Sequence, residues 1–182
     1  MLKKNPDRVL KVFVDIDGVL GDWQWGVHNL LGLHHITTEN YHQDNNQYAN
    51  EYYDGIRNYQ KRGGEFWYDL PELPHARKLW DCISRYKHAV ITAIGSNDLQ
   101  AASQKKRWML RHFAEEHVIV IERTREKCYF AKPNHILIDD QTRAIDGWVE
   151  RGGIGILFED VDTVIKNVEN IFRTHPNARL CA

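Results

Sequence analysis

The chain has 182 residues, of which 42% are hydrophobic and 27% are charged, so it can bury the core of one domain with a modest insertion but not of two full-size domains. Its 24 basic and 25 acidic residues give a net charge of −1, which supplies no overall charge for coating a nucleic acid backbone. This composition excludes a disordered chain, and the apolar runs, such as 89–94 and 117–121, are far shorter than the roughly 20 residues of a membrane-spanning helix.

The N-terminus and the cysteines both favour a cytoplasmic protein. Residues 1–8 carry several charges and no apolar run followed by small residues, so we expect no secretory signal. Cys82, Cys128 and Cys181 are an odd number without a Cys-x-x-Cys pair, which argues against a disulfide framework and against a zinc site. We therefore expect the protein to remain in a reducing cytoplasm.

The first predicted strand, residues 9–14, is apolar except for Lys11 and runs directly into Asp15-Ile16-Asp17-Gly18-Val19. In an open parallel sheet, ligands bind beyond the carboxyl ends of the strands, and two carboxylates two residues apart there point to the same side. Gly18 allows the backbone to turn away and expose amide groups to an anion. On its own this pattern also fits an aspartate pair that forms a turn and a cap.

No strand-like run occurs in residues 21–69, and this segment is rich in aromatic side chains. Because a structureless loop of that length would be unusual, we predict a small helical insertion, with helices near 22–31 and 48–61 and a hinge or return turn at Gly63-Gly64. The aromatic side chains could form the core of the insertion or stack on a nucleobase, and the candidates for stacking are Trp23, Trp25, Tyr52, Tyr53, Phe66 and Trp67. We assign His34, His35 and His42 of the segment to a solvated loop rather than to a metal site.

From residue 70 onward, predicted helices and strands alternate. The predicted strands are 89–94, 118–121, 136–138 and 154–158, and the predicted helices are 74–86, 97–113 with Asn97 as candidate N-cap, a helix from about Thr142, and 160–172. This alternation predicts an α/β fold with a doubly wound, Rossmann-like parallel sheet and right-handed crossovers. Trp80, Trp108 and Trp148 fall on the predicted helices, and we expect them to be packing residues.

A second acidic pair, Asp139-Asp140, ends the fourth predicted strand. Adjacent carboxylates repel each other unless a cation offsets their charge, and oxygen ligands suit Mg²⁺, so two such pairs at strand ends predict a magnesium site. An aspartate N-cap for the helix near Thr142 would explain one member of the pair but not both. The second strand ends in Thr92-Ala93, which places a hydroxyl group and amides at the same edge.

The order of these motifs resembles that of the haloacid dehalogenase superfamily of phosphohydrolases: Asp15-x-Asp17-Gly18-Val19, a strand-terminal Thr92, lysines, then Asp139-Asp140. The resemblance covers about residues 9–158 and implies a sheet of order 5-4-1-2-3 with all four motifs at one edge. It also implies an α/β core formed by residues 1–20 and 70–182, with a small helical cap, residues 21–69, inserted after the first strand.

A closer resemblance is to the 5'(3')-deoxyribonucleotidase family. The segments that carry it are residues 15–22, Phe66 with residues 70–76, Lys105-Lys106-Arg107-Trp108, and residues 136–140. The chain departs from the family in one place: where the family has Thr-Ser, this sequence has Thr92-Ala93 and so lacks the second hydroxyl group.

The resemblance and the chemistry of the residues together imply the catalytic roles. Asp15 would attack phosphorus and form an aspartyl phosphate, and Asp17 would act first as general acid and then as general base. Mg²⁺ would be held by Asp15, by the main-chain carbonyl of Asp17 and by the pair Asp139-Asp140. An aspartate at the position of Asp17 separates the phosphatases of the superfamily from its dehalogenases, so we do not expect cleavage of carbon–halogen bonds.

Thr92, the amides that follow it and a lysine would bind the transferring phosphoryl group. Lys127 best matches the lysine motif of the superfamily, Lys132 precedes Pro133 and fits a turn, and Lys105 matches the lysine before the family's tryptophan, so the choice among the three stays open. The residues expected to contact the substrate are Gly18, Phe66, Trp67, Ala93 and Lys105.

The sequence therefore predicts a magnesium-dependent phosphomonoesterase that acts on a small phosphorylated substrate, expected to be a deoxyribonucleoside monophosphate. The enzyme alternatives are a phosphatase of another small metabolite and a polynucleotide 3'-phosphatase whose backbone-binding residues would be Lys105, Lys106, Arg107, Arg111, Arg123 and Arg125. The alternatives without catalysis are a receiver-like signalling domain, which would have no long insertion after its first strand, and a degenerate phosphate-binding domain. We expect no membrane partner, and the sequence does not predict an oligomeric state.

Overall fold

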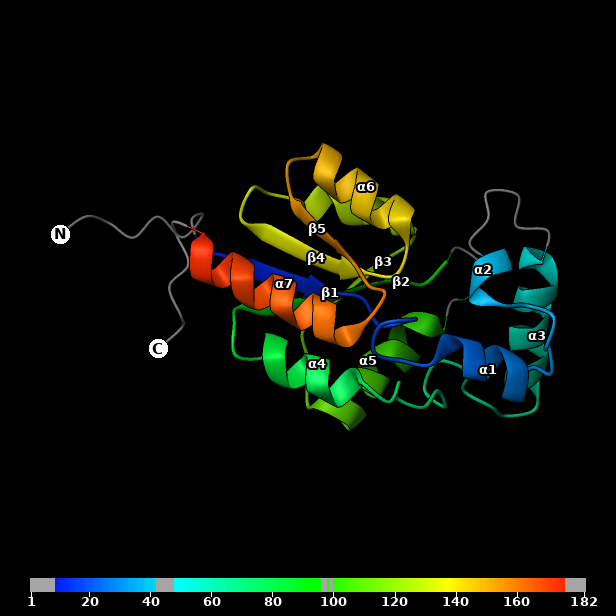
Figure 1. The fold of residues 1–182 in the computed structure, drawn as a ribbon. Coiled ribbons are helices and arrows are strands. Elements are labelled where there is room, and N and C mark those ends of the chain that lie inside the picture. Colours follow the sequence, from blue (N-terminus) through cyan, green and yellow to red (C-terminus); the bar gives the residue numbers. More distant parts are fainter. Residues whose placement is uncertain (1–8, 42–47, 96–97, 99, 176–182) are drawn as a thin grey trace.

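The computed structural model describes residues 9–41, 48–95, 98 and 100–175. Its centre is an all-parallel, five-stranded sheet in the order β3-β2-β1-β4-β5, which confirms the predicted order counted from the opposite edge (Figure 1). The strands are β1 (Lys11–Val14), β2 (His88–Ala93), β3 (Val118–Ile121), β4 (His135–Asp139) and β5 (Ile154–Leu157). The predictions for residues 1–8, His42, Asn97 and Cys181 lie outside the described residues.

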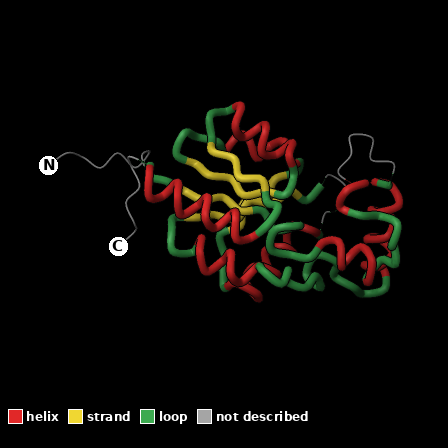
Figure 2. Tube along the Cα trace, in the orientation of Figure 1, coloured by secondary structure: helices red, strands yellow, loops and turns green. Residues whose placement is uncertain are grey.

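Helices cover both faces of this sheet (Figure 2). They are α4 (Ala76–Ile83), α5 (Ala101–Phe113), α6 (Thr142–Glu150), α7 (Val161–Thr174) and the 3₁₀ helix η2 (Thr124–Phe130). Val12 and Val14 of β1 pack on one side with α4, α5 and α7, whereas Phe13 packs on the other side with α6 and η2. Because both faces of each central strand are buried, the strands read as apolar runs in the sequence, interrupted in β1 only by the partly exposed Lys11.

Most predicted elements are present, with shifted ends. Helix α5 begins at Ala101 rather than near residue 97. The side chain of Asp98 accepts hydrogen bonds from the amides of Gln100 and Ala101 at this end of the helix. Two short elements were not predicted, η2 and α2 (Thr38–Tyr41), because a few residues are too short for a recognisable helical period. Trp80, Trp108 and Trp148 are buried, which confirms them as packing residues.

Helices α1 (Trp23–Asn29), α2 and α3 (Ala49–Lys61) lie beyond the carboxyl ends of the strands (Figure 1). The side chain of Asp22 caps α1 by accepting a hydrogen bond from the amide of Trp25 at 2.9 Å. The aromatic residues of this region form a separate hydrophobic cluster, which Ala101 of α5 joins. The assignment of residues 21–69 to a cap domain stays a prediction. None of the described helices is both long enough and apolar enough to cross a membrane.

Candidate active site

The pairing of β1 with β4 brings the two acidic motifs together. Val14 of β1 is in register with Ile138 of β4, and the amide of Asp15 donates to the carbonyl of Ile138 at 3.0 Å. Asp15, which directly follows β1, and Asp139, the last residue of β4, therefore lie side by side on neighbouring strands. After Asp15 the chain turns sharply at Gly18, whose φ of +76° is a left-handed conformation that favours glycine.

Three carboxylates form one cluster at this edge of the sheet. Asp15, Asp139 and Asp140 each contribute an oxygen atom, and these atoms lie within 4.8 Å of one another. The buried ammonium group of Lys127 lies 2.8 Å from Oδ2 of Asp15 and donates to Oδ2 of Asp139 at 2.6 Å. Of the three candidate lysines, Lys127 is thus the one that contacts the nucleophile candidate, whereas Lys132 is exposed in the turn before β4.

Burial and like charges change the acidities in this cluster. Burial raises the pKa of Asp139 to about 6, an increase that Lys127 opposes and Asp15 adds to. Burial also raises the pKa of Asp140 well above its ordinary value, and repulsion by Asp139 and Asp15 raises it further. Burial alone would lower the pKa of Lys127, but attraction by Asp15 and Asp139 raises it above the usual lysine value, so this side chain is a fixed positive charge.

Lys105 binds Asp17, the second aspartate of the first motif. Its ammonium group donates to Oδ2 of Asp17, to Oγ1 of Thr92 at 3.1 Å and to the carbonyl of Ala93 at 2.6 Å, and the side chain is only 1% exposed. The same ammonium group lies 4.0 Å from the ring centroid of Trp67. Burial raises the pKa of Asp17 above its ordinary value, against the attraction of Lys105 and with added repulsion from Asp15.

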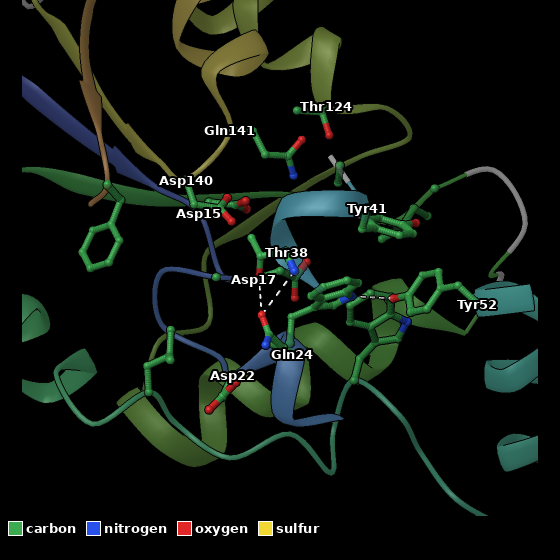
Figure 3. A pocket seen from close by; sticks show the side chains of 18 of the residues that line it. Asp15, Asp17, Asp22, Gln24, Thr38, Tyr41, Tyr52, Thr124, Asp140 and Gln141 are labelled. Carbon is green, nitrogen blue, oxygen red and sulfur yellow. Dashed lines mark hydrogen bonds between the residues drawn. The ribbon is translucent and has the colours of Figure 1, made fainter. Parts of the chain in front are cut away.

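The acidic cluster opens into a cavity of about 1030 Å³ (Figure 3). Of the predicted site residues, the ones that line it are Asp15, Asp17, Gly18, Trp67, Ala93 and Asp140. Thr92, Lys105, Lys127 and Asp139 are buried behind this wall. These four residues therefore act on a ligand mainly through the lining residues: Lys127 contacts Asp15, and Lys105 contacts Asp17.

Several substrate-binding predictions need correction. Phe66 was expected to contact the substrate, but it is completely buried in the aromatic cluster, 4.9 Å from the ring of Trp67, because that small cluster needs its apolar volume. Gly18 was expected to let the chain expose amide groups to an anion, but its own amide donates to the carbonyl of Gly21 at 3.0 Å. The amides of Ile94 and Gly95, which follow Thr92-Ala93, donate to main-chain carbonyls at 3.0 and 2.9 Å.

The cavity also contains residues that the sequence did not reveal. Thr124 follows the carboxyl end of β3, so the strand-end rule that found the aspartates could have found it too; its neighbour Arg123, predicted only as a contact for a polynucleotide backbone, lines the same cavity. Gln24 and Thr38 come from α1 and α2 and have no sequence signal, since only folding brings positions 14 residues apart into contact. The histidines predicted to be solvated are consistent with that reading where described: His34 and His35 are exposed.

The donor atoms of the cluster fit a hard divalent cation. All candidate ligands are oxygens, and Oδ1 of Asp15 is a buried atom for which the described residues supply no hydrogen-bond partner. A buried carboxylate oxygen without a donor is costly unless a cation or a reacting group faces it. The side chain of Asp17 lies outside the cluster and is held by Lys105, which leaves its main-chain carbonyl as the part that could serve as a ligand.

Comparisons with known proteins identify the family. The model of the family "5' nucleotidase, deoxy (Pyrimidine), cytosolic type C protein" matches residues 8–176. A comparison with curated proteins found no match.

Solved structures of similar fold include haloacid dehalogenases and other hydrolases. A hydrolase from Streptococcus pneumoniae TIGR4 is 13% identical with a TM-score of 0.54, over 88% of this chain and 98% of that one. A haloacid dehalogenase-like protein from Streptococcus pneumoniae is 17% identical with a TM-score of 0.53, over 82% and 84%. L-2-haloacid dehalogenase from Xanthobacter autotrophicus is 10% identical with a TM-score of 0.53, over 89% and 83%. The chain therefore has the haloacid dehalogenase fold, belongs to the family of cytosolic type C 5' nucleotidases, deoxy (pyrimidine), and is a phosphoric monoester hydrolase.

Proposed function

We propose that this phosphatase hydrolyses deoxyribonucleoside monophosphates in a Mg²⁺-dependent reaction that passes through an aspartyl phosphate. The observation that carries the proposal is the cluster of Asp15, Asp139 and Asp140 around Lys127, at the wall of a cavity whose other side is aromatic. The family's description names 5' nucleotidase, deoxy and pyrimidine, which supports a pyrimidine deoxynucleotide as substrate and the cytosol as location.

The first chemical step is assigned to Asp15 and Asp17. An oxygen of Asp15 attacks phosphorus in line, so that a new bond from phosphorus to this oxygen forms while the bond from phosphorus to the ester oxygen breaks. Asp17 donates its proton to the departing ester oxygen, which leaves as the nucleoside hydroxyl group. Because burial raises the pKa of Asp17, its carboxyl group can hold this proton nearer neutral pH than an exposed aspartate could.

The second step returns both aspartates to their starting states. Asp17, now ionised, takes a proton from a water molecule that attacks phosphorus, and the bond from phosphorus to Asp15 breaks to release inorganic phosphate. Lys105 holds Asp17 in place during both steps through its hydrogen bond to Oδ2. Lys127 keeps a positive charge beside Asp15.

The metal ligands would be Asp15, Asp139, Asp140 and the main-chain carbonyl of Asp17. A bound Mg²⁺ would offset the repulsion between the anionic nucleophile and the anionic phosphate. The alternative of a polynucleotide 3'-phosphatase is less well supported, because the proposed basic track is not continuous. Arg107 is paired with Glu65, Arg111 lies 5.1 Å from the ring of Tyr68, and of that set only Arg123 and Arg125 line the cavity.

The test is a phosphate-release assay with Mg²⁺ across deoxyribonucleoside and ribonucleoside monophosphates and 3'-phosphorylated oligonucleotides. We expect the mononucleotides to be hydrolysed, and Asp15→Asn to reduce kcat by at least about 1000-fold. Asp81→Asn, a matched change at an exposed position of α4, should keep the native rate. Native-rate hydrolysis by Asp15→Asn would rule out the covalent mechanism. If the enzyme hydrolysed other phosphate esters but no mononucleotide, a deoxyribonucleoside monophosphate would be ruled out as the substrate.

A further inference from the structure

The ammonium group of Lys105 uses all of its hydrogens inside the protein. It donates to Oδ2 of Asp17, to Oγ1 of Thr92 at 3.1 Å and to the carbonyl oxygen of Ala93 at 2.6 Å. An ammonium group has three N–H donors, so none is left for a ligand or for water. Lys105 therefore acts on the reaction through Asp17 rather than by binding the phosphate itself.

The hydrogen bond from Lys105 makes the two oxygens of Asp17 different. Oδ2 accepts from the ammonium group, whereas Oδ1 is a buried atom for which the described residues supply no hydrogen-bond partner. A proton on Oδ2 would oppose the N–H group that points at it, so the proton of the proposed first step belongs on Oδ1. Since Asp17 lines the cavity, the position of Lys105 decides how this proton is presented to a ligand there.

The indole ring of Trp67 separates Lys105 from the cavity. Trp67 lines the cavity, whereas Lys105 does not and is only 1% exposed. The ammonium nitrogen lies 4.0 Å from the ring centroid, where the electron-rich face of the ring attracts a cation. Without this ring, water from the cavity would reach the ammonium group and compete for its hydrogen bond to Asp17.

Two contacts with the core hold Trp67 in this place. Its indole N–H donates to Oδ2 of Asp98 at 2.5 Å, and its main-chain amide donates to Oε1 of Gln104 at 3.0 Å. Asp98 is itself buried, and its Oδ1 accepts hydrogen bonds from the amides at the start of α5. Because α5 also carries Lys105, Asp98 fixes the ring relative to the helix from which the ammonium group extends. A chain of contacts thus runs from Asp98 through Trp67 and Lys105 to Asp17.

We propose that Trp67 and Asp98 are positioning residues for the proton transfer by Asp17, because they keep the ammonium group of Lys105 in place and shielded from water. This inference rests on the proposed function and adds two residues to it, neither of which exchanges a proton with the substrate. Loss of this support misdirects the proton of Asp17 and leaves the acidic cluster around Lys127 unchanged. The effect is therefore largest for a leaving group that needs a proton.

The test compares two substrates that differ in one atom, 2'-deoxyuridine 5'-monophosphate (dUMP) and its analogue with sulfur in place of the 5' ester oxygen. The oxygen leaving group of dUMP needs the proton from Asp17, whereas the analogue loses a thiolate, which is far less basic and leaves without one. Base, sugar and phosphate are shared, so the ratio of the two kcat/KM values measures the proton transfer. In Asp17→Asn, we expect dUMP to lose about 100-fold or more relative to the sulfur analogue.

Trp67→Leu and Asp98→Asn should show the same pattern at a smaller size. Relative to the sulfur analogue, we expect dUMP to lose about 10- to 100-fold in Trp67→Leu, which exposes the ammonium group. In Asp98→Asn we expect a loss of about three- to tenfold, because one amide oxygen cannot serve both the indole and the amides of α5. Any contact of Trp67 with the substrate itself affects both substrates equally and cancels in the ratio.

The matched control is Asp160→Asn. Asp160 caps α7 by accepting hydrogen bonds from main-chain amides at 2.9 and 3.1 Å, as Asp98 does for α5, but it lies outside the cavity. This variant should keep the native kcat/KM for both substrates. A change of the ratio in the control as large as in Asp98→Asn would show that the effect comes from helix capping and would overturn the role of Asp98.

A double variant shows whether Asp98 acts through Trp67. Trp67→Phe keeps a ring beside Lys105 but has no N–H group for Asp98, so adding Asp98→Asn to it should cause no further change in the ratio. A further loss in the double variant would overturn the chain of contacts. Should Trp67→Leu fail to fold, as judged by circular dichroism, Trp67→Phe and Asp98→Asn decide.

The outcomes separate this inference from the proposed function. A ratio that stays native in Trp67→Leu and Asp98→Asn, or an equal loss for both substrates, would overturn the positioning role while leaving the proposed nucleotidase intact. An unchanged ratio in Asp17→Asn would overturn the assignment of Asp17 as proton donor and the inference with it. A native enzyme that hydrolyses neither substrate would overturn both proposals.

Discussion

Replacing Gly18 with alanine should damage the acidic cluster more than the fold. Gly18 has a φ of +76°, a conformation that costs other residues about 1–2 kcal/mol. A Cβ atom at this position would lie 2.7 Å from Cγ of Asp140 and closer still to its Oδ2. Because ordinary contacts of a Cβ begin near 3.4 Å, Cγ of Asp140 would have to move by roughly 0.7 Å and its Oδ2 by more than that.

A displacement of that size matters for catalysis. Misplacing a catalytic group by about 1 Å can cost about 100-fold in rate, so we expect kcat/KM for phosphate release to fall by about 10- to 100-fold. If Asp140 is a metal ligand, the Mg²⁺ concentration that gives half the maximal rate should rise as well. Urea denaturation should show a loss of only about 1–2 kcal/mol, which is the cost of the backbone conformation.

Gly152→Ala is the matched control. Gly152 has a φ of +84°, but a Cβ there would meet no atom within 4 Å, and the residue lies outside the cavity. The control should lose a similar amount of stability and keep its activity. If Gly18→Ala were as active as Gly152→Ala, the close packing of Gly18 against Asp140 would have no catalytic meaning, and the reasoning would be refuted.

Two further predictions concern stability. Lys127→Met should cost about 3–5 kcal/mol at pH 7, because Asp15 and Asp139 would keep buried negative charge without their cation. Carboxyl groups left without Lys127 bind protons more tightly in the folded state, so urea denaturation should show a smaller loss at pH 5 than at pH 7; a loss below about 1 kcal/mol at pH 7 would contradict the role of Lys127. Burial lowers the pKa of His135, so the folded state holds it neutral and loses stability as the pH falls below about 6.5, by at most about 1.4 kcal/mol per pH unit. Because His135→Gln has no such dependence, its deficit relative to the native chain should shrink from pH 7.5 to 5.5 in urea unfolding, and a constant deficit would show that His135 does not titrate in this range.

The strand ends could be predicted because two simple rules act on them together. Unbroken apolar runs mark strands buried on both faces, and polar residues that follow such runs must lie at the open edge of the sheet. The runs before Asp15 and Asp139 satisfy both rules, and the register of β1 with β4 then places the two residues side by side. The strand order itself came from the resemblance to a family, since alternation of helices and strands does not specify it.

The aromatic region could not be predicted to the same depth. Stacking on a base and packing in a core require the same residue types, so sequence alone could not separate Phe66, which is completely buried, from Trp67, which is 6% exposed and lines the cavity. The difference comes from tertiary contacts. The indole of Trp67 donates to Asp98 at 2.5 Å, and its main-chain amide donates to Gln104 at 3.0 Å, both contacts being made with the core. The spacing of hydrophobic residues along the sequence does not reveal such long-range contacts.

The charges at the sheet edge explain why two lysines are buried there and why a divalent cation would still fit. Lys105 contacts Asp17, and Lys127 contacts Asp15 and Asp139, while Asp140 completes a set of four aspartates. With all four aspartates ionised, the two lysines leave a formal excess of two negative charges, which Mg²⁺ would neutralise; with the proton on Asp17 that the proposed first step requires, the excess is one. Burial and repulsion raise the pKa of Asp140, so the cluster can also reduce its charge by taking up a proton. Because each lysine contacts a different motif aspartate, Asp15 and Asp17 can have different tasks although they are two residues apart: Lys127 keeps a cation beside the proposed nucleophile, and Lys105 orients the proposed proton donor.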